Sequence, residues 1–162
     1  PIPTHAPLSI TPIANPSFAR PDIRIGKKSS ASSHKGNGRY NTSGAGQKLK
    51  VLTTGGKRAQ YFVSVESDSD VPDPVMLRAK KAKKEFQNKY FVREGGRWAN
   101  RTASIRKSGY VVPDSAYRAV EVRVRTKGKG DSGSARQVLR FEAKSSANPG
   151  LKDVVKATVT AK

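Results

Sequence analysis

Apolar and polar side chains alternate strictly in three segments of the last third of the chain. Residues 120–125, 137–143 and 155–161 each place valine, leucine, phenylalanine or alanine at every second position. Side chains of a strand point alternately to opposite faces of a sheet, so this period of two predicts three strands with one buried face each. A shorter apolar run at 110–112 stops at Pro113 and predicts a brief additional strand.

Residues 48–66 have the pattern of a β-hairpin. Residues 48–52 read Lys-Leu-Lys-Val-Leu, and the returning segment 61–65 places its aromatic and valine side chains on one face. Gly55-Gly56 lies between the two runs, and a glycine pair between alternating segments is a typical hairpin turn. The pattern therefore predicts two adjacent antiparallel strands.

The spacing of residues 73–92 predicts an amphipathic helix. Asp73 suits the N-cap, Pro74 suits the first helical position, and Gly95-Gly96 suits the end. The apolar residues that recur at helical spacing are Val75, Ala79, Ala82, Phe86 and Tyr90. Six of the other positions carry Lys or Arg and one carries Glu, which predicts a helix with one docked face and one positive face.

Residues 1–47 have the composition of an extended arm. Six of the ten prolines fall within the first 21 residues, and residues 26–46 are rich in glycine, serine and lysine. Scattered apolar side chains favour an arm that lies along a neighbouring subunit, with contacts from Ile2, Leu8, Ile10, Ile13 and Phe18. A disordered tail with scattered apolar residues is the alternative.

Taken together, these patterns predict an α+β domain over residues 48–162, preceded by the arm 1–47. We expect a small antiparallel β-sheet packed with the one amphipathic helix. The helix or a partner covers one face of that sheet, and Arg123, Arg125 and Arg140 lie on the uncovered face.

The net charge of the chain indicates what kind of partner it binds. The chain carries 32 Lys and Arg against 12 Asp and Glu, a net charge of +20, whereas solubility needs a net charge of only about 2–8 in a small domain. Such an excess favours a polyanion, and nucleic acid is favoured over an anionic membrane because no apolar-faced basic helix with Trp or Leu anchors is present. We expect contacts mostly to phosphates, with RNA favoured over DNA. The basic residues predicted to make these contacts are Arg24, Lys27, Lys28, Lys35, Arg39, Lys80, Lys81, Lys83, Lys84, Arg97, Arg101, Arg106, Lys107, Arg123, Arg125 and Arg140.

The residue types that most catalytic and metal sites require are scarce. The chain has no cysteine, and its two histidines, His5 and His34, are isolated in sequence. Thiolate chemistry and a His-based metal cage are therefore not expected. The acidic cluster at 66–73 lacks the glycine and glutamate spacing of a calcium loop. We predict a protein that is not an enzyme and that holds no metal or cofactor.

Four aromatic residues near basic positions are candidates for stacking on bases: Tyr40, Trp98, Tyr110 and Tyr117. Burial in a small core is the alternative for each of them. Without an aromatic RNA-binding motif, recognition of backbone and shape is the expected mode.

Residues 117–124, the Gly/Ser/Lys loop that follows and residues 138–143 resemble the paired, Arg- and Lys-bearing strands of coat proteins of small single-stranded RNA phages. The resemblance implies strands that face RNA on the inside of a self-assembling particle. The first 19 residues carry no charge, which fits a protein lattice better than an arm threaded through RNA. We therefore expect a capsid or virion protein located in the virion. The alternatives are a ribosomal protein with an rRNA-binding extension, located in the cytoplasmic ribosome, and a non-specific DNA-binding protein of the nucleoid.

Overall fold

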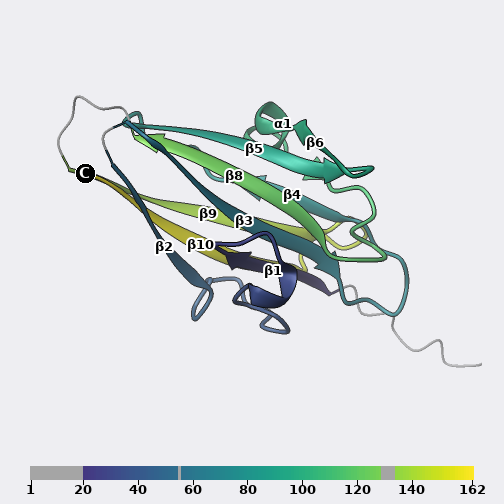
Figure 1. Cartoon of the computed structure of the whole chain (residues 1–162). Coiled ribbons are helices and arrows are strands. Elements are labelled where there is room, and N and C mark those ends of the chain that lie inside the picture. The colour runs from purple at the N-terminus through teal and green to yellow at the C-terminus, as the bar shows by residue number, and fades with distance from the viewer. Residues whose placement is uncertain (1–19, 55, 129–133) are drawn as a thin grey trace, which may run out of the picture.

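The computed structural model describes residues 20–54, 56–128 and 134–162, which form two five-stranded β-sheets packed face to face (Figure 1). The order of strands in sheet A is β1 (Pro21–Gly26), β3 (Arg58–Ser67), β8 (Val120–Gly128), β5 (Phe86–Glu94) and β6 (Arg97–Asn100). The order in sheet B is β2 (Lys48–Thr53), β10 (Lys152–Ala161), β9 (Ala135–Ser145), β4 (Val75–Ala79) and β7 (Tyr110–Val111). Neighbouring strands are antiparallel except β10 and β2, which are parallel.

The core lies between the two sheets and consists of the inward side chains of the alternating strands. At its centre, Phe141 of sheet B packs edge-on against two tyrosines of sheet A. The ring centroid of Phe141 is 6.2 Å from that of Tyr61 and 5.9 Å from that of Tyr90. All three side chains are fully buried, so this aromatic cluster joins the sheets.

The expected α+β fold with one amphipathic helix is wrong, because the domain is a β-sandwich. Residues 73–92 form β4, a turn and β5 instead of a helix. A spacing of four residues fits a helical turn and also two periods of a strand, which is why the apolar stripe was ambiguous. As two strands, the segment also buries Leu77 and Val92, which a helix would leave off its apolar stripe.

The predicted hairpin at 48–66 is wrong in its pairing, although both strands exist. β2 belongs to sheet B and β3 to sheet A, so the turn at 54–57 carries the chain from one sheet to the other. Lys57 N–H donates to the Thr54 carbonyl across this turn, at 2.8 Å. Two paired strands of a hairpin and two strands in facing sheets both bury every second side chain. The alternating sequence pattern therefore fits both arrangements. The connection from β8 to β9 also crosses between sheets.

Residues 21–47, expected as part of an arm, are bound into the sandwich. β1 pairs with β3 from Pro21↔Ser67 to Gly26↔Phe62, and both Ile23 and Ile25 are fully buried. A 3-10 turn, η1 (Ala31–Ser33), follows β1. The expected boundary at residue 47 therefore does not match a break in the fold, because the isoleucines of this segment belong to the core. Residues 1–19, with the predicted subunit contacts, lie outside the described part of the chain.

Other predictions are confirmed. Strands cover residues 120–128, 135–145 and 152–161, and the short run at 110–111 is β7. The segment after β6 forms the short helix α1 (Thr102–Arg106), which joins β6 of sheet A to β7 of sheet B along one edge (Figure 1). Within the described residues, no helix has the length and apolar character that a membrane span needs.

Candidate nucleic-acid interface

The outer face of sheet B gathers cations from four strands. Register across β2, β10 and β9 places Lys48, Lys156 and Arg140 side by side. The positions two residues apart along each strand carry more basic side chains on the same face. The full set, called here the sheet-B face, is Lys48, Lys50, Arg78, Lys80, Arg136, Arg140, Lys144, Lys152 and Lys156.

One carboxylate, that of Glu142, lies among these nine cations. It pairs with Lys144 at 3.2 Å, Arg140 at 3.3 Å and Lys152 at 3.7 Å. Partial burial raises the pKa of Glu142, but the hydrogen bond and charge of Lys144, with help from Lys152 and Arg140, outweigh this and lower the pKa overall. Glu142 therefore stays charged and organises three cations, while most of the positive charge of the face remains unbalanced.

The outer face of sheet A is also basic, but its arginines lie against aromatic rings. The guanidinium carbon of Arg123 is 4.5 Å from the ring centroid of Trp98 and 5.0 Å from that of Phe91. Arg125 lies 5.2 Å from Phe91, and Arg93 lies 5.9 Å from Trp98. Desolvation, with the charge of Arg125, lowers the pKa of Arg123. These arginines cover the aromatic surface of the sheet, which leaves them less available to phosphate.

The structure does not bring Arg123, Arg125 and Arg140 to one uncovered face, as the sequence predicted. Arg123 and Arg125 lie on the outer face of sheet A, and Arg140 lies on the sheet-B face. The two outer faces are on opposite sides of the sandwich. The prediction failed because β8 and β9, although consecutive, belong to different sheets.

Two further predicted cations have carboxylate partners. Arg24 hydrogen-bonds to Asp22 at 2.8 Å and also pairs with Glu66. Arg101 donates two hydrogen bonds to Glu94, at 2.8 and 2.6 Å, and these lower the pKa of Glu94. Such paired side chains fix local structure and contribute little net charge to an interface.

The remaining predicted residues fall into three groups. Lys80, Lys81, Arg106 and Arg140 come together where β4 and β9 approach α1, with Lys107 nearby. Lys83 and Lys84 are exposed in the turn between β4 and β5. The others are exposed at the surface: Lys27, Lys28, Lys35, Arg39 and Arg97. Of these, Lys27 lines a hollow together with Lys50 and Arg136 of the sheet-B face.

Sequence reasoning missed seven residues of the sheet-B face. Their basic side chains alternate with buried residues along β2, β4, β9 and β10, which was a usable signal for an outward face. The parallel pairing of β2 with β10 was not readable, so nothing indicated that these residues share a surface. The seven residues are Lys48, Lys50, Arg78, Arg136, Lys144, Lys152 and Lys156.

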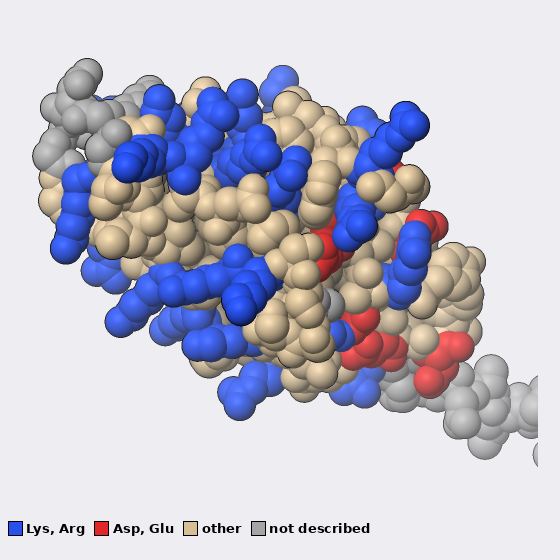
Figure 2. Space-filling model, in the orientation of Figure 1, with Lys and Arg blue, Asp and Glu red and all other residues tan. Residues whose placement is uncertain are grey.

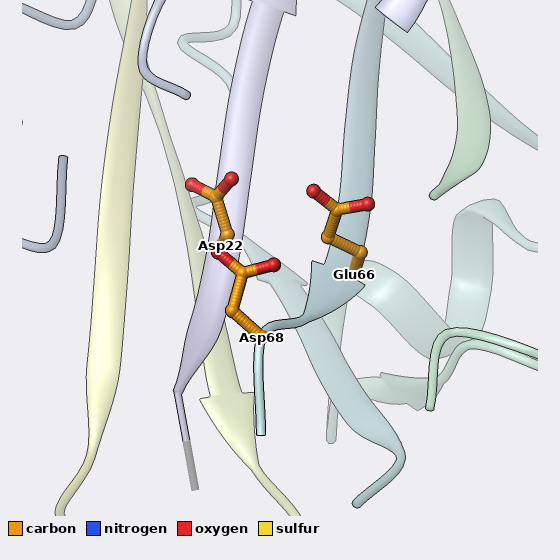
Figure 3. A group of neighbouring side chains, drawn as sticks. All are labelled: Asp22, Glu66 and Asp68. Carbon is orange, nitrogen blue, oxygen red and sulfur yellow. The ribbon is translucent and has the colours of Figure 1, made fainter. Parts of the chain in front are cut away.

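Carboxylates gather at one end of the molecule, whereas Lys and Arg spread over most of the visible face (Figure 2). At that end, oxygen atoms of Asp22, Glu66 and Asp68 lie within 4.8 Å of one another (Figure 3). The Arg24 guanidinium is bound between Asp22 and Glu66, and the Tyr40 hydroxyl donates to Asp68. Because Arg24 already supplies the positive charge, this cluster needs no metal ion to explain it.

His34 and Ser64 form the one His–Ser contact among the described residues. His34 Nδ1 hydrogen-bonds to Ser64 Oγ, and Nε2 hydrogen-bonds to the Lys28 carbonyl at 2.8 Å. Both residues are buried, so the contact holds the segment after β1 against β3.

No protein-family model matches the chain, and no curated protein matches it in sequence. Among solved structures, the N-terminal domain of PorA shares 10% identity over 88% of this chain and 98% of that chain, with a TM-score of 0.47. The PapD-like domain 7 of human CEP192 shares 14% identity over 98% of this chain and 96% of that chain, with a TM-score of 0.42. A family 123 glycoside hydrolase from Clostridium perfringens shares 7% identity over 70% of this chain, with a TM-score of 0.43, and the chain spans 22% of its length. Similarities this low carry no argument about function.

The described residues thus define a β-sandwich domain with two basic outer faces. The resemblance to phage coat proteins stays a hypothesis, and so does the expectation that the chain is not an enzyme.

Proposed function

We propose that this β-sandwich is a binding module that holds nucleic acid by its phosphodiester backbone on the sheet-B face. The observation that carries the proposal is the composition of that face, nine cations against the single carboxylate of Glu142. Charge balance within the fold does not account for such an excess, because the other carboxylates on the described strands lie elsewhere. Asp22, Glu66, Glu94 and Glu121 belong to sheet A, and Asp153 is buried.

The geometry of a sheet suits a repeating polyanion. Outward side chains recur about every 7 Å along a strand and about every 5 Å across strands, which forms a regular grid of positive charge. Each phosphate neutralised by such a grid releases condensed counterions, so binding is sequence-tolerant and weakens with salt. Hydrogen bonding to bases is not required, in agreement with the absence of an RNA-binding motif in the sequence.

The biological setting rests on the sequence alone. The virion role, with self-assembly through Ile2 to Phe18, depends on residues outside the described part of the chain. Packaging of RNA in a coat is therefore our first proposal for the setting. A ribosomal or nucleoid role is the alternative.

The test uses two variants with the same change in charge. In the first, Lys48, Lys50, Arg136 and Lys156 of the sheet-B face are replaced by Gln; none of these four makes an ion pair within the described residues. In the matched control, Lys57, Arg58, Lys89 and Lys127 are replaced by Gln, and these exposed cations lie on or beside the outer face of sheet A.

Binding of a single-stranded RNA of about 30 nucleotides is measured by fluorescence anisotropy across a salt series. The sheet-B variant is expected to flatten the slope of log K against log salt by about 3, since each lost single-strand phosphate contact removes about 0.7. The control is expected to change the slope by less than about 1. Equal effects of the two variants, or no binding by the wild type, would overturn the proposal.

A further inference from the structure

Two adjoining hollows lie at the edge of the sheet-B face, beside α1. The first has a volume of about 360 Å³ and forms where the end of β4 approaches β9 and α1. Five basic side chains and one carboxylate line it: Arg78, Lys80, Lys81, Arg106, Arg140 and Glu142. Five cations converge on this concave surface, whereas three, Lys27, Lys50 and Arg136, line another hollow on the sheet-B face.

The second hollow shares Lys81 and Arg106 with the first and continues around the edge of the sandwich. Its volume is about 700 Å³, and Asn100, Thr102 and Lys107 contribute to its lining. The shared residues make the two hollows one track, which runs from the sheet-B face to the end of β6.

The cations of the first hollow differ in whether they have hydrogen-bond or ion-pair partners. Arg140 donates to the Thr42 carbonyl at 2.8 Å and pairs with Glu142, so its position is fixed. Within the described residues, Arg78, Lys80, Lys81 and Arg106 have no carboxylate within ion-pair distance. Glu142 is already shared by three cations. The hollow therefore presents four unbalanced cations around one held arginine.

We propose that the first hollow binds the terminal phosphate of a nucleic-acid strand and that the strand continues along the track through the second hollow. This rests on the proposed function, because the nucleic-acid strand whose end enters the hollow is the one that the sheet-B face binds. A terminal phosphomonoester carries a charge of about −1.5 to −2 at neutral pH, more than a phosphodiester, and has an additional free oxygen. Arginines can bind such a group through paired, charge-assisted hydrogen bonds, which a concave site accommodates better than a flat face.

The experiment compares single-stranded 12-mers that differ at one end. Oligonucleotides with a 5′-phosphate, with a 3′-phosphate or with hydroxyls at both ends are bound to the full chain. The double variant Arg78→Gln with Arg106→Gln is compared with a matched control, Arg58→Gln with Lys89→Gln, on the outer face of sheet A at the opposite side of the sandwich. Inorganic phosphate serves as a competitor, to separate a strand end from a free phosphate.

We expect wild type and control to prefer one phosphorylated end over the hydroxyl form by about tenfold or more, the effect of a hydrogen bond to a charged group. The double variant should lose that preference while retaining binding of the hydroxyl form within about threefold, since two cations of the track are lost. Inorganic phosphate should compete far more weakly than the phosphorylated oligonucleotide.

Failure of the terminal-phosphate site and failure of the proposed function give different results in this experiment. Equal binding of all three oligonucleotides by the wild type overturns the terminal-phosphate site and leaves the sheet-B face intact. Competition by inorganic phosphate at the same concentration as the phosphorylated oligonucleotide overturns the assignment to a strand end. Loss of salt-sensitive binding altogether would instead overturn the proposed function.

Discussion

The carboxylate of Asp153, on β10, accepts a hydrogen bond of 3.1 Å from the backbone N–H of Ile23, on β1. The same carboxylate accepts hydrogen bonds from Asn41 N–H at 2.9 Å and from the Gln47 side-chain amide at 2.8 Å. Asp153 is fully buried. A single acidic side chain thus links β1, Asn41 and Gln47 to sheet B, in addition to the pairing of β1 with β3 in sheet A.

Replacement of Asp153 by Ala is expected to lower the free energy of unfolding by roughly 3–5 kcal/mol, because it leaves several buried N–H groups without an acceptor. Urea denaturation of the full chain measures the effect. Asp70→Ala is the control, since Asp70 is exposed and makes no ion pair among the described residues, and it should cost about 0.5 kcal/mol or less. A loss as small as that of the control would show that water replaces Asp153 without penalty.

The carboxylates of Glu142 and Asp153 should make the free energy of unfolding depend on pH in opposite directions. Because cations lower the pKa of Glu142 below 4.5, its contribution is present at neutral pH and is lost as the pH falls through the lowered value. Burial raises the pKa of Asp153 above 3.8, so the folded state gains stability from this group as the pH falls from above the raised value toward 3.8.

Unfolding free energies of Glu142→Gln, Asp153→Asn and wild type, measured between pH 3 and pH 7, check both signs. The advantage of wild type over Glu142→Gln should shrink on acidification below about 4.5. The difference between wild type and Asp153→Asn should shift in favour of wild type over the same range. Parallel curves for the two variants would contradict the opposite signs.

The aromatic cluster of Phe141, Tyr61 and Tyr90 predicts a large cost for a cavity between the sheets. Phe141→Ala should lower the free energy of unfolding by about 3–5 kcal/mol. Val138→Ala in the same strand is the matched control, because Val138 points outward with 51% of its surface exposed, and it should cost about 0.5 kcal/mol. Similar costs for both variants would be inconsistent with a core centred on Phe141.

Trp98 is the single tryptophan of the chain, so its fluorescence reports on the outer face of sheet A. Nucleic acid bound on the sheet-B face should leave the emission within about 10% of its original intensity, since base stacking on Trp98 is not part of that mode. Titration with single-stranded RNA under low-salt conditions measures this. Strong quenching that follows the binding curve would place the nucleic acid on sheet A instead.

Trp98→Phe serves as the companion variant for that titration. It retains an aromatic ring for Arg123 and is expected to bind RNA with unchanged salt dependence. A marked loss of affinity in Trp98→Phe would indicate that the indole itself contacts the ligand.

Several strands were predictable because their signal is local. In residues 120–125 and 139–143, every second side chain is apolar, and this alternation alone indicates which face of each strand is buried. Lys80, Lys81 and Arg106 were each predicted to contact phosphates, but the sequence did not indicate that they line one hollow. The prediction of a helix at 73–92 was wrong because a spacing of four residues fits both the helical and the strand period.

Alternation states which side of a strand is buried, but it does not state which sheet covers that side. The β-sandwich, the placement of β2 and β3, and of β8 and β9, in different sheets and the parallel pairing of β2 with β10 are set by packing between residues far apart in sequence. That packing places Lys48 beside Lys156 and Lys156 beside Arg140, and so creates the sheet-B face. The sequence alone therefore specified the alternating strands and the excess of positive charge. The tertiary structure decided that residues 21–26 and 73–92 also form strands and where the charge is concentrated, because burial of apolar faces between two sheets selects the pairing of the strands.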